Sequence, residues 1–183
     1  MKSHADISKF LSYVLRHQPE SIGLQLDTEG WAAVNDLITL AGKAGTPLTP
    51  ALIEAVVRDN DKQRFALTED KLHIRAVQGH STNQVAMTWA EKQPPQTLWH
   101  GTATRFINSI RAQGLVAGSR HHVHLSGDEV TAMSVGKRHG KPVVLKIRAG
   151  AMHQQGFAFY QAENGVWLTL AVPAAFIDFS AAE

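Results

Sequence analysis

Apolar residues near the start of the chain recur at the spacing of a helix. Between residues 7 and 15 they fall three or four positions apart, on one helical face: Ile7, Phe10, Leu11, Val14 and Leu15. Pro19 predicts the end of this helix a few residues later. Arg16 and His17 are therefore expected at its C-terminal end, where the helix dipole favours cations.

The same pattern predicts two more helices and a hairpin before residue 77. A short strand through Trp31 leads into a helix for which Asn35 is the expected N-cap. Thr49 as N-cap and Pro50 in the first helical position predict the start of a third helix. Residues 64–76 contain two short apolar segments around a polar turn, which is the pattern of a hairpin. Three helices followed by a hairpin is the element order of a winged helix-turn-helix unit.

The pattern changes after residue 78. Residues 79–97 are polar, show no sustained periodicity and contain a Pro-Pro pair, so we interpret them as a connector. Beyond them, a strand and a helix closed by Gly114 precede a strand at residues 122–126 and a helix near residues 128–140. The remainder has the short apolar segments of several strands. The fold class predicted for the whole chain is α+β, with a mainly β second half.

Composition places the chain among ordinary globular proteins. Hydrophobic residues make up 44% of the 183 positions and charged residues 19%, enough for one large domain or two small ones. No apolar run approaches the roughly 18 residues of a membrane span, and the first residues lack the pattern of a signal peptide. We therefore expect a cytoplasmic protein that does not bind membranes. The absence of cysteine from the sequence excludes disulfides, thiolate catalysis and cysteine-bound zinc.

Charge is divided unevenly between two parts of the chain. Residues 1–92 contain 10 Lys and Arg against 11 Asp and Glu, whereas residues 93–183 contain 8 against 5. We take this boundary as the division between two predicted domains. A formal net charge of only +2 indicates that any nucleic acid is bound through a few placed cations and not through a general basic field.

Several common catalytic and nucleotide-binding motifs are missing from the sequence. It contains neither the glycine-rich P-loop nor the Rossmann fingerprint. It also lacks the H-E-x-x-H motif of zinc proteases and the G-x-S-x-G motif of serine hydrolases. If the chain binds a nucleotide, it does so in another kind of pocket.

The segment SRHHVHLS, residues 119–126, is the densest group of candidate functional side chains. In an extended strand its alternate residues share one face, namely Arg120, His122, His124 and Ser126. A guanidinium on that face would repel a divalent cation, which argues against a metal site although histidines two residues apart are a common ligand spacing. Arginine with neutral imidazole instead suits a phosphate or a ribose. A solvated strand face without a ligand is the alternative.

Other candidate residues are scattered along the chain. Arg16 and His17 form a second Arg-His pair, and Arg64 begins the predicted hairpin. The tripeptide HGT, residues 100–102, follows a short apolar strand, where a glycine would allow close approach of a ligand. Each of these has an ordinary structural alternative: a helix end that attracts cations, a surface arginine, and a tight turn. Only their combination indicates a function.

Six stretches of the sequence together resemble one family. They begin at residue 7 with ISKFLSYVLRHQPESIGLQLDTEGWAAVNDLI and continue in order with KQRFAL, IRAVQGHS, LWHGT, SRHHVHLS and ENGVWLTLAVPAAFI, which ends at residue 177. In these stretches the chain resembles the NAD-dependent RNA 2'-phosphotransferases that act in tRNA splicing. The resemblance implies an N-terminal winged-helix lobe that binds RNA, residues 1–92, and a C-terminal lobe of ADP-ribosyltransferase-like fold that binds NAD, residues 93–183.

The resemblance also implies a reaction and its residues. In the family an internal 2'-phosphate of RNA is transferred to NAD in two steps, with release of nicotinamide and ADP-ribose 1'',2''-cyclic phosphate. NAD is thus a co-substrate, RNA bearing an internal 2'-phosphate is the partner, and neither a metal nor an obligate protein partner is implied. The essential residues of the family fall on Arg16, His17, Arg64 and Arg120. Its NAD-binding residues fall on His100, Gly101, Thr102 and Ser126. One departure is Ala162, where the family leads us to expect serine.

Two other functions are open at this point. An ADP-ribosyltransferase that modifies nucleic-acid phosphate or protein would share the NAD site but would stop after the first step. A winged-helix regulator whose second lobe senses a ligand would be no enzyme at all. The slightly negative balance of residues 1–92 counts against such a regulator, because non-specific affinity for DNA needs several phosphate contacts.

Overall fold

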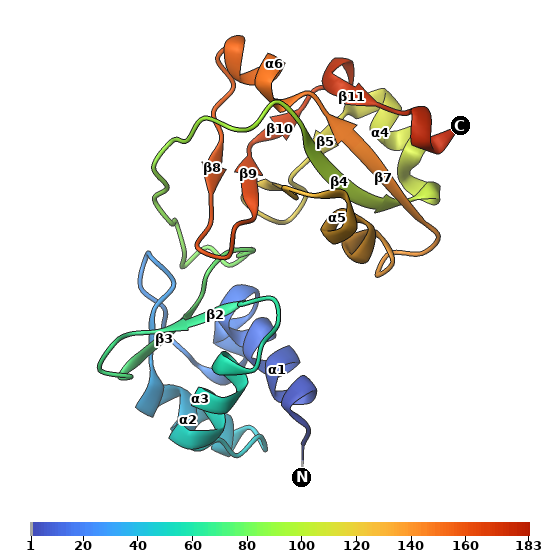
Figure 1. Ribbon diagram of the computed structural model, residues 1–183. Coiled ribbons are helices and arrows are strands. Elements are labelled where there is room, and N and C mark those ends of the chain that lie inside the picture. The colour runs from blue at the N-terminus through green and yellow to red at the C-terminus, as the bar shows by residue number, and fades with distance from the viewer. Residues whose placement is uncertain (1) are drawn as a thin grey trace. The chain divides into compact units, whose positions relative to one another are not determined.

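The computed structural model describes residues 2–183, and the chain divides into two compact units, Met1–Thr88 and Trp89–Glu183 (Figure 1). Each unit combines helices with antiparallel strands around a hydrophobic core of its own, in one sheet in the first unit and three in the second. The predicted α+β class is therefore confirmed. No helix within residues 2–183 combines the length and the apolar character that a membrane crossing requires.

The first unit contains the predicted three helices and hairpin. The helices are α1 (His4–Arg16), α2 (Val34–Lys43) and α3 (Pro50–Arg58), with the 3-10 turn η1 (Pro19–Ile22) after the first. β2 (Phe65–Leu67) and β3 (His73–Ala76) form the antiparallel hairpin, and the short strand β1 (Ala32–Ala33) pairs with the other edge of β3. Apolar residues from every one of these elements meet in one core, among them Leu11, Leu24, Ala32, Leu37, Ile53, Phe65 and Ile74.

Helix α1 presents the Arg16–His17 pair, and local sequence explains both of its ends. Ser3 and Asp6 form a capping box: Ser3 Oγ accepts a hydrogen bond from the Asp6 N–H, and the Asp6 carboxylate accepts one from the Ser3 N–H. The helix ends at Arg16 with His17 as C-cap, as predicted. Four residues of the predicted apolar face are at most 1% exposed: Ile7, Leu11, Val14 and Leu15.

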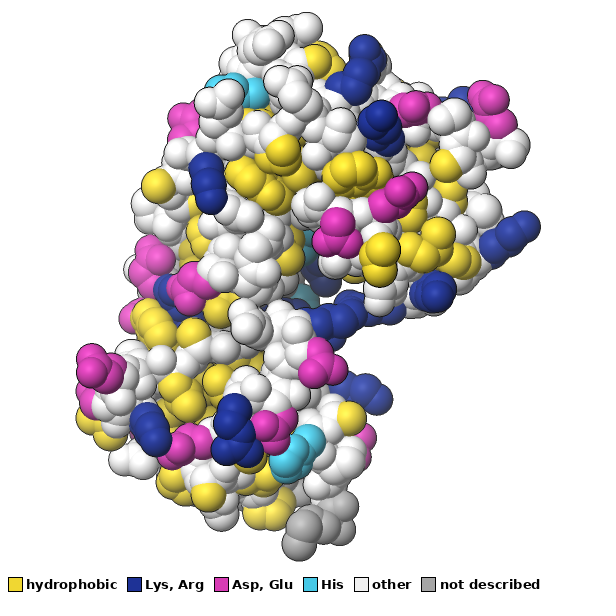
Figure 2. Space-filling model, viewed as in Figure 1, with side chains coloured by type: hydrophobic (Ala, Val, Ile, Leu, Met, Phe, Trp, Pro, Cys, Tyr) yellow, Lys and Arg dark blue, Asp and Glu magenta, His cyan; other side chains and the backbone are white. Residues whose placement is uncertain are grey.

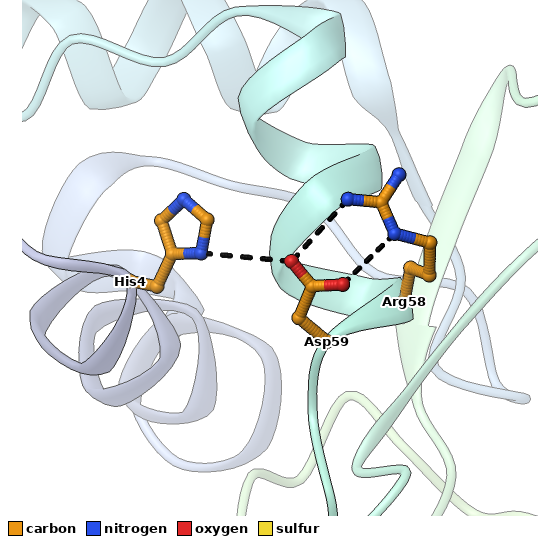
Figure 3. Close-up of polar contacts among 3 residues, drawn as sticks. All are labelled: His4, Arg58 and Asp59. Atoms are coloured by element: carbon orange, nitrogen blue, oxygen red, sulfur yellow. Dashed lines mark hydrogen bonds and ion pairs between the residues drawn. The ribbon is translucent and has the colours of Figure 1, made fainter.

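An exposed group of charges joins the start of α1 to the end of α3 (Figure 3). Asp59 accepts hydrogen bonds from Nε of Arg58 at 2.8 Å and from Nη2 at 3.3 Å, and it lies 3.9 Å from Nδ1 of His4. The Arg58 guanidinium holds the pKa of the Asp59 carboxyl below its usual value. Because all three side chains are exposed, this group contributes little to stability. Arg58 is therefore a suitable control for the candidate arginines.

One predicted cap is confirmed and another is wrong. Helix α3 begins as expected, with Thr49 Oγ1 accepting from the Leu52 N–H at 3.1 Å and Pro50 in the first helical position. Helix α2 does not begin at Asn35, because its N-cap is Ala33 and Asn35 lies in its first turn. The chain enters this helix directly from β1, and the Val34 N–H is held by the Leu72 carbonyl at 2.8 Å. Long-range pairing therefore fixes the start of α2 without a capping side chain.

The predicted connector contains no helix or named strand, yet both of its ends are bound to the units they adjoin. In the first unit, the Ser81 and Thr82 N–H groups donate to the Arg16 carbonyl, and the Ala86 N–H donates to the Thr28 carbonyl at 2.8 Å. In the second unit, the Lys92 N–H donates to the Phe159 carbonyl at 2.8 Å. Residues 81–86 are thus part of the first unit's structure and do more than connect.

The second unit is built from three small antiparallel sheets. In the first, β4 (Leu98–Ala103) pairs with β7 (Pro142–Ile147), and β7 pairs with β11 (Ile177–Asp178). The second has the order β6 (Val123–Leu125), β9 (Trp167–Thr169), β8 (Tyr160–Gln161), and the third pairs β10 (Ala171–Val172) with β5 (Leu115–Val116). The helices are α4 (Ile107–Gln113), α5 (Glu129–Gly136) and α6 (Ala149–Gln154). Three 3-10 turns complete the unit: η2 (Thr104–Phe106), η3 (Ala174–Phe176) and η4 (Ser180–Ala182).

The two larger sheets meet where the candidate NAD-binding residues lie. The Trp99 N–H donates to the Ser126 carbonyl at 2.9 Å, and the Ser126 N–H donates to the Trp99 carbonyl at 2.7 Å. This bridge places the end of β6 beside β4. The HGT tripeptide and the HVHLS stretch, which begin 22 residues apart in the sequence, therefore lie side by side in the fold.

Candidate active site

Two of the candidate catalytic residues close helix α1. Arg16 is only 8% exposed, which is rare for an arginine, and the neighbouring His17 is partly buried. Nδ1 of His17 lies 2.8 Å from Oγ of Ser81, 64 residues further along the chain. The N–H groups of Ser81 and Thr82 donate to the Arg16 carbonyl at 2.8 and 3.1 Å. The segment around Ser81 thus holds the end of the helix through both backbone and side chain.

Arg64, the third candidate, lies in the same unit immediately before β2 and is partly buried. Its N–H donates to Oδ1 of Asn60 at 3.3 Å, and its carbonyl accepts from the Val77 N–H at 3.0 Å. Asn60 in turn donates from Nδ2 to Oγ of Ser8 on α1 at 3.0 Å. The backbone that carries the Arg64 guanidinium is therefore connected both to the hairpin and to the helix that carries Arg16 and His17.

A polar hollow of about 380 Å³ opens beside His17 in the first unit. Apart from the Glu20 carboxylate, the side chains that line it are hydroxyls, amides and the His17 imidazole, all able to hydrogen-bond. Such a lining suits the polar groups of a nucleotide better than an apolar ligand. The remaining lining residues are Gln18, Ser81, Thr82, Asn83 and Gln84.

In the second unit, His100 is fixed by a backbone contact between the two larger sheets. Its Nδ1 lies 2.9 Å from the His124 carbonyl oxygen. A carbonyl can only accept, so Nδ1 carries the hydrogen and Nε2 has the lone pair when the ring is neutral. Burial lowers the pKa of the His100 imidazole below 6.5, which keeps the ring neutral at neutral pH. His100 therefore offers a hydrogen-bond acceptor at a defined position.

Arg120, the fourth candidate, is held by the side chain of His124. Its Nη1 lies 3.1 Å from Nδ1 of His124. A guanidinium can only donate, so His124 must accept through Nδ1 and carry its hydrogen on Nε2. This contact therefore requires a neutral His124.

The prediction that alternate residues between 120 and 126 share one face of a strand is partly wrong. Strand β6 covers only Val123–Leu125, and Arg120 lies in the preceding turn, where its N–H donates to the Ala117 carbonyl at 3.2 Å. Arg120 still reaches His124, whereas the His122 ring packs edge-on against Tyr160, with ring centroids 5.7 Å apart. The turn, and not strand alternation, brings Arg120 and His124 together.

The glycine of the HGT tripeptide is required by helix packing. A Cβ at Gly101 would lie 1.6 Å from the Ala132 carbonyl oxygen of α5, so no other residue fits without moving that helix. Thr102 beside it is 6% exposed. The space left by the missing side chain was expected to accommodate a ligand, but α5 fills it. The tight packing of Gly101 against α5 holds this part of β4 in place and so positions His100.

Charges on the visible face of the first unit are mixed, as Figure 2 shows, with basic and acidic side chains interspersed. This agrees with the near-balance of charge in residues 1–92. Arg16, His17 and Arg64 belong to this unit, and Arg120 and the four candidate NAD-binding residues belong to the other.

Residues 2–183 contain no group of three or more His, Asp or Glu side chains that could hold a metal ion.

Comparison with known proteins gives a consistent result. The sequence model of the RNA 2'-phosphotransferase, Tpt1 / KptA family matches residues 2–171. The chain belongs to this family. It is 62% identical over 175 residues to the probable RNA 2'-phosphotransferase of Pectobacterium carotovorum subsp. carotovorum (strain PC1), covering 96% of this chain and 94% of that protein. It is 58% identical over 178 residues to the RNA 2'-phosphotransferase of Escherichia coli (strain K12), covering 97% of each chain.

Membership of the RNA 2'-phosphotransferase family confirms the resemblance predicted from the sequence and makes the chain a transferase. The structure adds two residues that sequence reasoning did not assign, Ser81 and His124. Ser81 lies in the stretch taken for a connector, although the matching stretch IRAVQGHS ended on it. His124 was placed in the SRHHVHLS segment as one of several histidines, without a role. Only the contacts of these two side chains reveal their connection to His17 and Arg120.

Proposed function

We propose that this chain removes an internal 2'-phosphate from RNA, such as a splice-junction tRNA, by transferring it to NAD. The products are RNA with a free 2'-hydroxyl, nicotinamide and ADP-ribose 1'',2''-cyclic phosphate. The observation that carries the proposal is the family match over residues 2–171, which includes all eight candidate site residues. Residues 1–92 then form the winged-helix, RNA-binding lobe and residues 93–183 the ADP-ribosyltransferase-like, NAD-binding lobe. We place this activity in the cytoplasm.

The observed elements support these two assignments. Three helices followed by an antiparallel hairpin, as in the first unit, is the order of a winged helix-turn-helix unit. The second unit combines small antiparallel sheets with helices of similar total length, so it is α+β and not mainly β as predicted; its antiparallel sheets are the feature that supports the ADP-ribosyltransferase-like assignment.

In the first step an oxygen of the RNA 2'-phosphate attacks C1'' of the nicotinamide ribose, and the bond from C1'' to the nicotinamide nitrogen breaks. NAD supplies the activated ribose carbon and a neutral leaving group. The difficulty is that a phosphate monoester and a dinucleotide are both anions and repel each other. Guanidinium groups at Arg16, Arg64 and Arg120 would offset this repulsion, since each can bond two phosphate oxygens in a planar fork.

The candidate NAD-binding residues have a donor set suited to a ribose. Neutral His100, with its hydrogen fixed on Nδ1, offers Nε2 as an acceptor for a ribose hydroxyl. Thr102 on β4 and Ser126, which is bridged to β4 at Trp99, contribute hydroxyl groups, and Gly101 allows α5 to pack against β4. We assign these four residues to the binding of NAD.

In the second step the ribose 2''-oxygen attacks the phosphorus, and the bond from phosphorus to O2' of the RNA breaks. The 2''-hydroxyl loses a proton and O2' of the RNA gains one. His17 is the group assigned to this proton transfer, because imidazole changes charge near neutral pH. The guanidiniums stabilise the charge that builds on the phosphoryl oxygens without having to reorganise.

One assay tests the proposal against its rivals. The full chain is incubated with NAD and an oligoribonucleotide carrying one internal 2'-phosphate, with the 2'-hydroxyl oligonucleotide as matched control. The expected result is loss of the 2'-phosphate with formation of ADP-ribose 1'',2''-cyclic phosphate. RNA that gains ADP-ribose and keeps it would favour the ADP-ribosyltransferase alternative. Salt-sensitive affinity for duplex DNA without consumption of NAD would favour the regulator.

A further inference from the structure

We propose that Ser81 is a positioning residue that holds the His17 imidazole in one orientation in both protonation states that proton transfer requires. This inference rests on the proposed function, because it deepens the role assigned to His17 there. The contact that carries it is the 2.8 Å separation between Oγ of Ser81 and Nδ1 of His17.

The backbone of Ser81 is fixed independently of its hydroxyl. The N–H groups of Ser81 and Thr82 donate to the Arg16 carbonyl, the residue immediately before His17. On the downstream side, Oε1 of Gln84 accepts from the Leu26 N–H at 2.8 Å. Replacing the serine hydroxyl therefore removes the contact with His17 and leaves the segment in place.

Packing on the upstream side fixes the same segment. His80 is 4% exposed, and its ring lies against Gly30, where an added Cβ would be 3.0 Å from Nε2 of His80. Gly30 has a φ of +85°, a conformation that glycine adopts without strain. Ser81 is thus held between a buried histidine and the end of α1, so that its hydroxyl has a defined position relative to the His17 ring.

A hydroxyl is well suited to a histidine that changes charge. It can accept from Nδ1–H when the ring is neutral with its lone pair on Nε2, and it can still accept from Nδ1–H when Nε2 is protonated. Gain or loss of a proton at Nε2 therefore leaves this hydrogen bond and the ring in place. A carboxylate at this position would instead favour the protonated ring and raise its pKa. Proton exchange with the substrate is therefore assigned to Nε2 of His17.

Three charged or titratable groups adjoin His17 or Ser81 in the chain or line the same hollow. Arg16 precedes it on α1, Glu20 of η1 lines the same hollow, and His80 precedes Ser81 on the packed segment. A substitution at Ser81 leaves these three groups unchanged. Differences between variants at position 81 can then be attributed to the hydrogen bond to Nδ1.

Three substitutions at one position test the proposal in the full chain. Ser81→Ala is expected to lower kcat for cyclic-phosphate formation about tenfold, the effect of losing one hydrogen bond, with KM for NAD unchanged. Ser81→Thr keeps a hydroxyl and is expected to restore most of the activity. Ser81→Asp is expected to move the acidic limb of the kcat–pH profile to higher pH. Ser21→Ala is the matched control, because the Ser21 hydroxyl donates to the Gln18 carbonyl and not to His17.

A second measurement does not depend on activity. Ring ¹⁵N shifts of His17, assigned by comparison with His17→Gln, report its tautomer and its titration. Ser81→Ala is expected to change the Nδ1 shift and Ser81→Asp to raise the titration midpoint. Unchanged shifts in both variants, or a pH profile that stays fixed in Ser81→Asp, would overturn the proposal. If the shifts change as expected but the wild-type chain does not act on 2'-phosphorylated RNA, it is the proposed function that fails.

Discussion

The two units hold their candidate cations in different ways. In the first, Arg16 is a buried residue at a helix end, and its carbonyl is bound by two N–H groups of a fixed segment. In the second, Arg120 lies exposed in a turn, and its guanidinium donates to the ring of His124. The backbone bonds of the first unit do not depend on pH, whereas an imidazole acceptor is lost on protonation. We therefore expect the first unit to provide permanent electrostatic preorganisation and the second to provide a cation whose placement depends on pH.

The largest effect is expected at His17, the group to which we assign proton transfer in the proposed function. His17→Ala should slow the second step by roughly 10²- to 10⁴-fold, the range for loss of a general acid–base group. Nicotinamide release should continue, so ADP-ribosylated RNA should accumulate and be visible as a shifted band on a denaturing gel. Complete loss of nicotinamide release in this variant would show that His17 acts in the first step.

Loss of a cation should have the next largest effect. Arg64→Ala and Arg120→Ala are each expected to lower turnover by on the order of 10²- to 10³-fold while the chain stays folded. Lysine at either position should rescue only in part, because an ammonium cannot bond two phosphate oxygens in a fork. Steady-state rates with 2'-phosphorylated RNA measure this, and circular dichroism confirms folding.

Arg58→Ala is the control for this series, since it removes an exposed arginine that pairs with Asp59 at the surface. It should leave turnover unchanged. If Arg58→Ala costs as much as the other two changes, the effect is one of overall charge and not of particular positions.

Local signals were sufficient to predict much of the fold. The apolar spacing of α1, the Thr49–Pro50 start of α3 and the hairpin at residues 64–76 each depend on side chains a few positions apart. Asn35 was wrong as a cap because pairing of β1 with β3 fixes the start of α2. Helix α6 was not predicted, since six residues are too few to show helical periodicity.

The candidate site was harder to predict, because the contacts that hold its residues are not local in the sequence. The arginines and histidines could be named from sequence, because their residue types and the family resemblance single them out. What holds them could not be named, since Ser81 is 64 residues from His17 and the Arg120–His124 contact depends on a turn that ends the expected strand alternation. A hydroxyl or an imidazole that positions another side chain has no sequence signal of its own.

The pH dependence of Arg120 placement can be tested at His124. His124→Leu removes the acceptor and should lower turnover by roughly 10- to 100-fold, the effect of losing a hydrogen bond to a charged group. His124→Gln offers an amide oxygen that does not titrate, so it should retain more activity and lose part of the fall in rate at acidic pH. Rates measured from pH 5 to 8 distinguish the two. Equal rates and equal profiles for both variants would contradict a positioning role for His124.

The smallest effect is expected on the stability of the second unit and concerns His100. Burial lowers its folded-state pKa below 6.5, so between that lowered value and 6.5 the unfolded chain binds more protons than the folded one. The free energy of unfolding should therefore fall as pH drops below about 6.5, by at most roughly 1.4 kcal/mol per pH unit.

His100→Asn keeps an N–H donor for the His124 carbonyl but does not titrate, so it should flatten this slope. His121→Asn, at an exposed histidine nearby, should keep it. Urea denaturation at pH 7 and pH 5 gives the comparison, and an unchanged slope in His100→Asn would mean that His100 does not contribute to the pH sensitivity of this unit.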